Sequence, residues 1–270
     1  MAGELRFRTD LYRGTAPFYD RYRRPYPNEL LADLRRRLPV SGSGRLLDLA
    51  CGTGQVAFPL AEYFSEVWAV DQEEGSVAYG RAKAETRGIT NITWVAGSAE
   101  ATALDANFEL IAVGNAFQRL DRQLVAKRMY SWLQPGGGVA LLWSSTPWRG
   151  DRPWQRAMTE LFEDWMDRAG TTDRVPAAWE AIMHEDPHEQ VLRRAGFQYV
   201  GDFDFSVEQT WRVEALTGFV YRTSFLNTDA LGDKLRTFER ALADRLLSCE
   251  PGGTFQEFAN YAYQLARKPR

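Results

Sequence analysis

The chain has 270 residues, of which 44% are hydrophobic, a content that supports a substantial folded core. Its 33 lysine and arginine residues nearly balance 36 aspartate and glutamate residues, giving a net charge of −3. This balance leaves no strong field for nucleic acid or an anionic membrane, so we predict neither as a partner. No apolar run approaches the roughly 20 residues that span a bilayer. Two distant cysteines, Cys51 and Cys249, argue against a disulfide framework and favour a reducing compartment, which we expect to be the cytoplasm.

The first 40 residues are rich in aromatic residues and arginine, and we expect a helix from Asn28 to Arg37 after Pro25 and Pro27. The aromatic residues of this segment are Tyr12, Phe18, Tyr19, Tyr22 and Tyr26. Two interpretations stay open at this point. Either these side chains pack on the main sheet, or they form a lid over a ligand site, since they exceed what one helix-sheet contact requires.

The middle of the chain alternates strands with helices, which is typical of a parallel sheet. The predicted strands are residues 45–49, 66–71, 92–96, 108–113 and 138–143. The predicted helices between them are residues 55–64, 75–87 and 121–132. This order favours an α/β, doubly wound sheet whose ligand lies beyond the carboxyl ends of the strands.

The alternation stops after Trp143. A tryptophan-rich segment from Pro147 to about Ala181 has helix-like spacing and is expected to lie as a helical insertion over the ligand edge of the sheet. Beyond it we expect a helix at 190–196, a strand at 197–205, helices at 213–226 and 230–248, and a closing strand at 255–265, antiparallel and at the sheet edge. We therefore predict one domain, 1–270, made of a lid (1–40), a core (41–145), a helical cap insertion (146–187) and a C-terminal part of the sheet (188–270).

A glycine turn follows the first predicted strand. Gly52-Thr-Gly54-Gln-Val-Ala57 fits the pattern G-x-G-x-x-A, which nucleotide-binding and other nucleoside-cofactor folds share. Its two glycines allow unusual backbone conformations and close approach of a ligand to the main chain. Asp71 ends the second predicted strand, where its carboxylate can accept hydrogen bonds from ribose hydroxyls.

Four motifs in register carry a resemblance to a known family. They are Asp48-Leu-Ala50-Cys-Gly52-Thr-Gly54, Val70-Asp71, Gly97-Ser-Ala-Glu100 and Leu133-Gln-Pro-Gly-Gly-Gly138, preceded by Arg23-Arg-Pro-Tyr26-Pro27. In order and spacing the chain resembles the class I S-adenosylmethionine-dependent methyltransferases, most of all the small-molecule, type 11-like branch. The resemblance implies a mostly parallel seven-stranded sheet of the Rossmann-like methyltransferase fold. It also implies S-adenosyl-L-methionine as the cofactor and a small-molecule methyl acceptor, with specialised metabolism as the setting.

Roles for single residues follow from the resemblance alone. It implies that Asp48 orders the turn near the methionine end, that Ala50, Gly52 and Gly54 let the cofactor pass closely, and that Asp71 holds the ribose. It places Gln72 beside the adenine, Ser98 and Ala99 at the polar edge of the adenine, and Asn115, Ala116 and Phe117 at the sulfonium side. Arg23 is expected to bind the methionine carboxylate, because guanidinium matches carboxylate bidentately.

The chain departs from the family at three places that bear on chemistry. Ser98 stands where relatives often have an acid, so adenine recognition is expected to use a hydroxyl and main chain. Ala50 replaces the first of three common glycines, a change small enough to fit. Phe117-Gln-Arg-Leu-Asp121 stands where relatives often read Phe-His-Trp-x-Asp, so Gln118 occupies the position of a histidine base.

The acceptor pocket is predicted from aromatic residues that converge on the carboxyl edge of the sheet. Its members are expected to be Tyr12, Phe18, Tyr19, Tyr22, Phe117, Gln118, Trp148 and Tyr221. Because no histidine stands at 118, the general base is unknown, and Tyr19 and His184 are the candidates. An amine that binds neutral needs no base, so an amine acceptor is favoured over a hydroxyl, and carbon comes last. A non-catalytic cofactor-binding protein and a nicotinamide-dependent oxidoreductase remain the alternatives.

A zinc-protease pattern also occurs in His184-Glu-Asp-Pro-His188. Its chemistry needs both histidines on one face of a helix, and Pro187 should break that turn. We therefore predict no metal site and expect His188 to begin the next helix.

Overall fold

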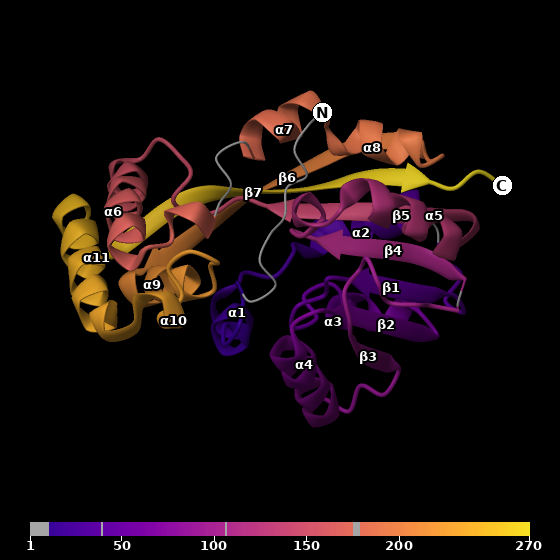
Figure 1. Cartoon of the computed structure of the whole chain (residues 1–270), viewed down its shortest axis with the longest axis horizontal. Helices are drawn as coiled ribbons and strands as arrows, with labels where there is room; N and C mark the ends of the chain where they lie inside the picture. The colour runs from indigo at the N-terminus through magenta and orange to yellow at the C-terminus, as the bar shows by residue number, and fades with distance from the viewer. Residues whose placement is uncertain (1–10, 39, 106, 175–178) are drawn as a thin grey trace.

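The computed structural model describes residues 11–38, 40–105, 107–174 and 179–270. Within these ranges the strands form one seven-stranded sheet in the order β3-β2-β1-β4-β5-β7-β6 (Figure 1). The strands are β1 (Arg45–Leu49), β2 (Glu66–Asp71), β3 (Ile92–Ala96), β4 (Phe108–Gly114), β5 (Leu133–Ser144), β6 (Gln198–Arg212) and β7 (Thr254–Arg267). β1 to β5 pair in parallel, whereas β7 runs antiparallel to both β5 and β6. The predicted mostly parallel, seven-stranded sheet is confirmed.

The α-helices alternate with the strands in the core and cluster after β5. They are α1 (Ala16–Tyr22), α2 (Asn28–Arg37), α3 (Ala57–Leu60), α4 (Glu74–Thr86), α5 (Arg122–Trp132), α6 (Pro153–Ala169), α7 (Trp179–Glu185), α8 (His188–Arg194), α9 (Val213–Tyr221), α10 (Thr228–Leu231) and α11 (Leu235–Cys249). Single 3-10 turns lie at Ala61–Tyr63, Phe117–Arg119, Thr172–Arg174 and Gly232–Lys234. None of the helices in the described ranges is both long and apolar enough to cross a membrane.

Apolar residues cover both faces of the sheet, as a doubly wound fold requires. On one face Leu30 and Leu34 of α2 pack with Leu46, Val67 and other strand residues. On the other face, Val125 and Met129 of α5 pack with strand residues such as Leu47. Val191 and Leu192 of α8 belong to the same cluster. Adjacent strand residues point to opposite faces, so strands buried on both faces read as continuous apolar runs.

The last two strands differ from the sequence expectation. β7 is antiparallel, as predicted. The prediction that β7 lies at the sheet edge was wrong, because β6 pairs with the outer side of β7 and forms the edge. β6 also runs on to Arg212, beyond the predicted end at residue 205. In Figure 1 this long pair of strands leaves the core sheet and extends toward α6, α9 and α11. The pair thereby supports the cap.

The cap has an apolar core of its own. Trp154, Phe162 and Trp165 of α6 pack with α9 and α11 and with Trp211 and Phe255 of the extended strands. Trp154 and Trp165 of the tryptophan-rich insertion are thus buried core residues, which explains their helical spacing.

The two faces of helix α1 lie in different environments, one against α9 and the other in the wall of a cavity. Phe18 and Tyr22, four residues apart, point toward α9, where the ring of Phe18 lies 5.3 Å from that of Tyr221. Thr15, Tyr19 and Arg23, again at four-residue spacing, line the cavity described next. Residues four apart share a face of a helix, so one face of α1 packs on α9 and the other lines the cavity. Tyr26, beyond α1, is the aromatic residue of this segment that packs with the main sheet.

Candidate functional site

A cavity of about 720 Å³ lies at the carboxyl ends of β1, β2 and β4, a size typical of small-molecule sites. The core contributes the turn after β1, the end of β2, the loop after β3 and the segment from the end of β4 into α5. The N-terminal segment from Leu11 to Tyr26 and the α7–α8 junction close it from the other side. The cavity is therefore where the doubly wound sheet predicts a ligand.

The turn after β1 gives the cavity a main-chain floor. Ala50 and Gly52 both adopt positive φ, 56° and 55°, and both line the cavity. A Cβ atom added at Gly52 would meet only the ring of Tyr19, at 3.9 Å. The main chain at Gly52 therefore faces open space that a ligand can fill.

Gly54, the second glycine of the turn, packs against the core. It has φ of 87°, and an added Cβ would lie 2.7 Å from Trp94 and 2.9 Å from Phe58. Among the described residues that line the cavity, Gly54 does not occur. Its missing side chain serves the packing of the turn on the core.

Asp71 lies at the end of β2, in the cavity wall. Its Oδ2 accepts from the Gly52 amide at 2.8 Å, and its Oδ1 accepts from the Glu73 amide at 2.9 Å. Burial raises the pKa of this carboxyl, while the two amide bonds oppose the rise. The carboxylate is thus fixed in orientation and keeps lone pairs for a ligand.

Asp48 is buried below the turn and also lines the cavity. Its Oδ2 accepts from the Ala57 amide at 2.8 Å, which fixes the turn to the start of α3. Its Oδ1 has no hydrogen-bond partner in the described structure. Burial raises the pKa of Asp48 to about 7. An unpaired buried oxygen beside a cavity is suited to a donor supplied by a ligand.

Arg23 reaches the cavity from the end of α1 and is 8% exposed. In the described part of the chain its side-chain hydrogen bonds go to hydroxyl oxygens, those of Tyr19 (3.1 Å), Tyr26 (3.2 Å) and Ser144 (3.2 Å). A buried guanidinium held only by neutral groups is poised for an anion.

Asn115 links this arginine to the end of β4. It has φ of 55°, donates from Nδ2 to the Tyr26 hydroxyl at 2.7 Å and accepts at Oδ1 from the Ser144 amide at 3.1 Å. Gln118 donates from Nε2 to the Asn115 carbonyl at 3.0 Å. Asn115, Ala116 and Gln118 all line the cavity.

The other predicted cofactor residues also lie in the cavity wall, except one. Gln72, Ser98 and Ala99 line it, and the Ser98 hydroxyl accepts from the Ala101 amide at 3.1 Å. Phe117 is buried instead against His188, with ring centroids 5.0 Å apart, and it is outside the described lining.

The predicted acceptor residues divide in the same way. Tyr12, Tyr19 and Gln118 line the cavity. Phe18, Tyr22, Trp148 and Tyr221 belong to the apolar core of the cap, where Trp148 packs on Phe162, Phe219 and Phe225. The structure does not bring these four to the described lining.

The two histidines of the zinc-like pattern lie on different helices. α7 ends at Glu185 and α8 begins at His188 after Pro187. His184 is exposed and is absent from the described cavity lining. No group of three or more possible metal ligands occurs among the described residues.

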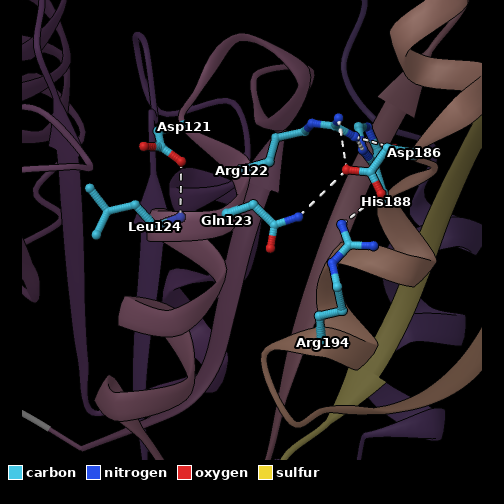
Figure 2. Close-up of polar contacts among 7 residues, drawn as sticks. All are labelled: Asp121, Arg122, Gln123, Leu124, Asp186, His188 and Arg194. Carbon is cyan, nitrogen blue, oxygen red and sulfur yellow. Dashed lines mark hydrogen bonds and ion pairs between the residues drawn. The ribbon is translucent and has the colours of Figure 1, made fainter. Parts of the chain in front are cut away.

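Asp186, at the α7–α8 junction, joins the cap to the core (Figure 2). It accepts from Arg122 Nη2 at 3.3 Å and from Arg194 Nη2 at 2.6 Å. Burial, with Arg122 nearby, lowers the pKa of His188 to about 4. Asp186 and Ile182 thus bring the cap insertion to the cavity wall.

Several lining residues belong to no motif in the sequence. They are Leu11, Thr15, Glu73, Ser76, Leu124, Ile182 and Asp186. Of these, Glu73 lies just beyond the end of β2, a position that could have marked it.

Comparisons with known proteins concern mainly the core of the chain. Residues 46–137 match a family model described as a methyltransferase domain. The chain is 32% identical over 120 residues to a demethylmenaquinone methyltransferase of Geobacillus kaustophilus, covering 43% of this chain and 51% of that one. It is 30% identical over 132 residues to a malonyl-[acyl-carrier protein] O-methyltransferase of Bacillus cereus, covering 47% and 48%. The chain thus spans about half the length of these two relatives.

A solved structure extends the likeness of fold over the whole chain. It is phosphoethanolamine N-methyltransferase 2 of Haemonchus contortus in complex with phosphomonomethylethanolamine and S-adenosylhomocysteine. The TM-score is 0.56 at 18% identity, covering 99% of this chain and 61% of that one. With the strand order, this likeness shows the Rossmann-like methyltransferase fold, and residues 46–137 are the part that matches a methyltransferase domain.

Proposed function

We propose that this protein transfers a methyl group from S-adenosylmethionine to an amine or hydroxyl of a small molecule, a specialised metabolite, in the cytoplasm. The observation that carries the proposal is the cavity over the Gly52 main chain, with Asp71 on one side and Arg23 on the other. Both curated relatives named above are methyltransferases, which supports the reaction class.

The residues present fit this cofactor. Asp71 offers a fixed carboxylate for ribose hydroxyls, and the turn at Ala50 and Gly52 leaves the main chain open. Asp48 has an unpaired oxygen for an ammonium group, and Arg23 has a guanidinium for a carboxylate. We assign Gln72, Ser98 and Ala99 to the adenine and Asn115 and Ala116 to the sulfonium side.

The mechanism that these residues support rests on position. S-adenosylmethionine supplies an activated methyl group, so the chain has to align the acceptor and exclude water, which can lower the barrier by roughly 7–11 kcal/mol. Tyr19 lines the cavity, and its ring faces the Gly52 turn, where we assign it to the exclusion of water. Gln118, whose amide is held by the Asn115 carbonyl, offers its side-chain oxygen to an acceptor N–H or O–H.

A turnover assay tests the proposal. The full chain is incubated with methyl-labelled S-adenosylmethionine and fractionated small metabolites, and label in a product other than the cofactor is counted. We expect transfer that Asp71→Ala abolishes. S-adenosylhomocysteine binding without any transfer would instead indicate a non-catalytic binder, and transfer of hydride to or from NAD would indicate an oxidoreductase.

A further inference from the structure

The hydroxyl group of Tyr26 has a hydrogen that no neighbouring residue uses. Tyr26 follows α1, is 3% exposed and lines the cavity. Its oxygen accepts from Arg23 Nη2 at 3.2 Å and from Asn115 Nδ2 at 2.7 Å. A hydroxyl has two lone pairs and one O–H, so these two bonds occupy the lone pairs and leave the hydrogen. Among the described residues no group accepts that hydrogen.

Both neighbours of this oxygen can only donate to it. The Asn115 Oδ1 accepts from the Ser144 amide at 3.1 Å, which fixes the amide so that Nδ2, a donor, faces Tyr26. A guanidinium such as that of Arg23 has no acceptor atom. Burial raises the pKa of Tyr26 to about 12, so the phenol keeps its hydrogen at pH 7. The O–H is therefore free for a third group.

The carboxylates of the cavity wall do not accept this hydrogen. They are Asp48, Asp71, Glu73, Glu100, Asp121 and Asp186. Where these carboxylates form hydrogen bonds within the described ranges, the donors are main-chain amides or, for Asp186, side chains of α5 and α8. Buried polar groups in proteins rarely lack a partner, so we expect a ligand to supply the acceptor for Tyr26.

Arg23 adds a positive charge beside the same hydroxyl. Of its five N–H donors, three go to the hydroxyl oxygens of Tyr19, Tyr26 and Ser144, which leaves two. A carboxylate has about four lone-pair sites and can accept from a guanidinium and a phenol together. An O–H bond to a carboxylate is also roughly twice as strong as a bond between neutral groups. Among the charged groups of S-adenosylmethionine, only the methionine carboxylate is negative.

The end of β4 holds the phenol in place. A Cβ atom added at Gly114 would lie 3.0 Å from the Tyr26 oxygen, so the hydroxyl approaches the main chain where the strand ends. The Tyr26 ring packs in the core, with its centroid 6.2 Å from that of Tyr261. A side chain that is already ordered loses little entropy when a ligand binds to it.

We propose that Tyr26 donates its hydroxyl hydrogen to the methionine carboxylate of the cofactor, beside Arg23. The proposal rests on the proposed function, because it requires S-adenosylmethionine in this cavity. Tyr26 is then a cofactor-binding residue that favours ligands with a carboxylate. Since Asn115, which we assign to the sulfonium side, donates to the same oxygen, Tyr26 also ties the position of the carboxylate to that side.

Tyr19 is not determined in the same way. Its hydroxyl accepts one hydrogen bond, from Arg23 at 3.1 Å, and so keeps a lone pair as well as its hydrogen. It therefore stays with the acceptor side of the cavity.

A pair of ligands tests the proposal. S-adenosylhomocysteine and its decarboxylated form, which keeps the amine, are titrated by calorimetry into the wild-type chain and into Tyr26→Phe. Because the variant removes only the hydroxyl, we expect S-adenosylhomocysteine to bind it at least about tenfold more weakly and the decarboxylated form to bind nearly as before. An equal loss for both ligands would mean that the phenol only supports the cavity. That result, or no loss for either ligand, overturns the proposal.

Ser144→Ala is the matched control. The Ser144 hydroxyl accepts from the same Nη2 atom of Arg23, at 3.2 Å, but lies outside the described cavity lining. The variant should therefore lose no more than about threefold in S-adenosylhomocysteine affinity. A loss as large as that of Tyr26→Phe would assign the effect to a displaced Arg23 and contradict donation by Tyr26. Tyr199→Phe, which removes an exposed phenol that donates to Asp202 at 2.7 Å, should change neither affinity.

A crystal structure of the wild-type chain with S-adenosylhomocysteine gives a readout that needs no variant. We expect a carboxylate oxygen of the ligand within about 2.5–3.0 Å of the Tyr26 oxygen. A carboxylate bound elsewhere in the cavity overturns the proposal and leaves the proposed function intact. A wild-type chain that binds no S-adenosylhomocysteine contradicts the proposed function itself.

Discussion

The two sides of the cavity are built from different materials. The side assigned to the cofactor consists of main chain and carboxylates at strand ends, held by amide bonds such as those from Gly52 and Glu73 to Asp71. The side assigned to the acceptor consists of side chains from the N-terminal segment, such as Tyr12 and Tyr19, and of Gln118 after β4. The first side fixes a common ligand through the fold, and the second can change with the acceptor while the sheet stays the same.

The largest expected effect is on the free energy of unfolding, and it comes from the buried carboxyl of Asp48 on the cofactor side. Its pKa is raised to about 7, so between pH 4 and pH 7 the folded protein binds more protons than the unfolded chain. Stability is then present at low pH and is lost as pH rises, by up to about 4 kcal/mol. Denaturant unfolding at pH 4 to 8 should show this slope, and Asp48→Asn should flatten it. An equal slope in the variant would exclude Asp48 as its source.

Asp71→Ala tests the same side through binding. The change removes a charged acceptor for ribose hydroxyls and the bond that orients the Gly52 amide. Hydrogen bonds to charged groups contribute about 1.5–3 kcal/mol each, so calorimetry should show a loss of S-adenosylhomocysteine affinity of at least about 100-fold. Glu62→Ala, which replaces an exposed side chain in the 3-10 turn after α3, is the control. Affinity within tenfold of the wild type would remove Asp71 from the site.

Gly54→Ala separates packing from binding within the turn. The new Cβ would meet Trp94 and Phe58, and φ of 87° is strained for alanine. We expect a loss of about 2 kcal/mol in the free energy of unfolding. Once folded, the variant should keep nearly normal affinity, because Gly54 lies outside the described cavity lining. Lost affinity at full stability would reverse this assignment.

Arg23→Met tests whether this arginine, which comes from the N-terminal segment, binds the carboxylate of the cofactor. S-adenosylhomocysteine should bind about 10- to 100-fold more weakly, because its carboxylate loses a bidentate partner. Methylthioadenosine, which lacks the methionine carboxylate, should bind the variant and the wild type alike. A parallel loss for both ligands would mean that Arg23 supports the pocket rather than the carboxylate.

Ala50→Gly should give the smallest effect. Ala50 has φ of 56°, a conformation that costs a residue with a Cβ roughly 1 kcal/mol and glycine little. The greater freedom of glycine in the unfolded chain offsets part of this gain. We expect a net stabilisation of about 0.5 kcal/mol in thermal unfolding. A destabilised variant would show that the Ala50 side chain packs usefully in the wall.

The sequence predicted the cofactor side far better than the acceptor side, for a physical reason. Strand ends and the glycine turn are local, so Asp71 could be placed from its spacing to the turn, and Ser98 and Asn115 from the resemblance of the motifs. The acceptor side depends on which face of α1 meets the cavity, and Phe18 and Tyr19 adjoin in sequence but point to different environments. Phe18 meets Tyr221 only because α9 packs on α1, a contact between segments far apart in the chain.

Calorimetric titration of the wild-type chain with S-adenosylhomocysteine and, in parallel, with NAD tests most directly which cofactor the cavity binds. The structure leads us to expect binding of S-adenosylhomocysteine with one site per chain and no measurable heat from NAD at the same concentrations. Preferential binding of NAD would contradict the account, because the same turn and Asp71 would then serve a nicotinamide cofactor.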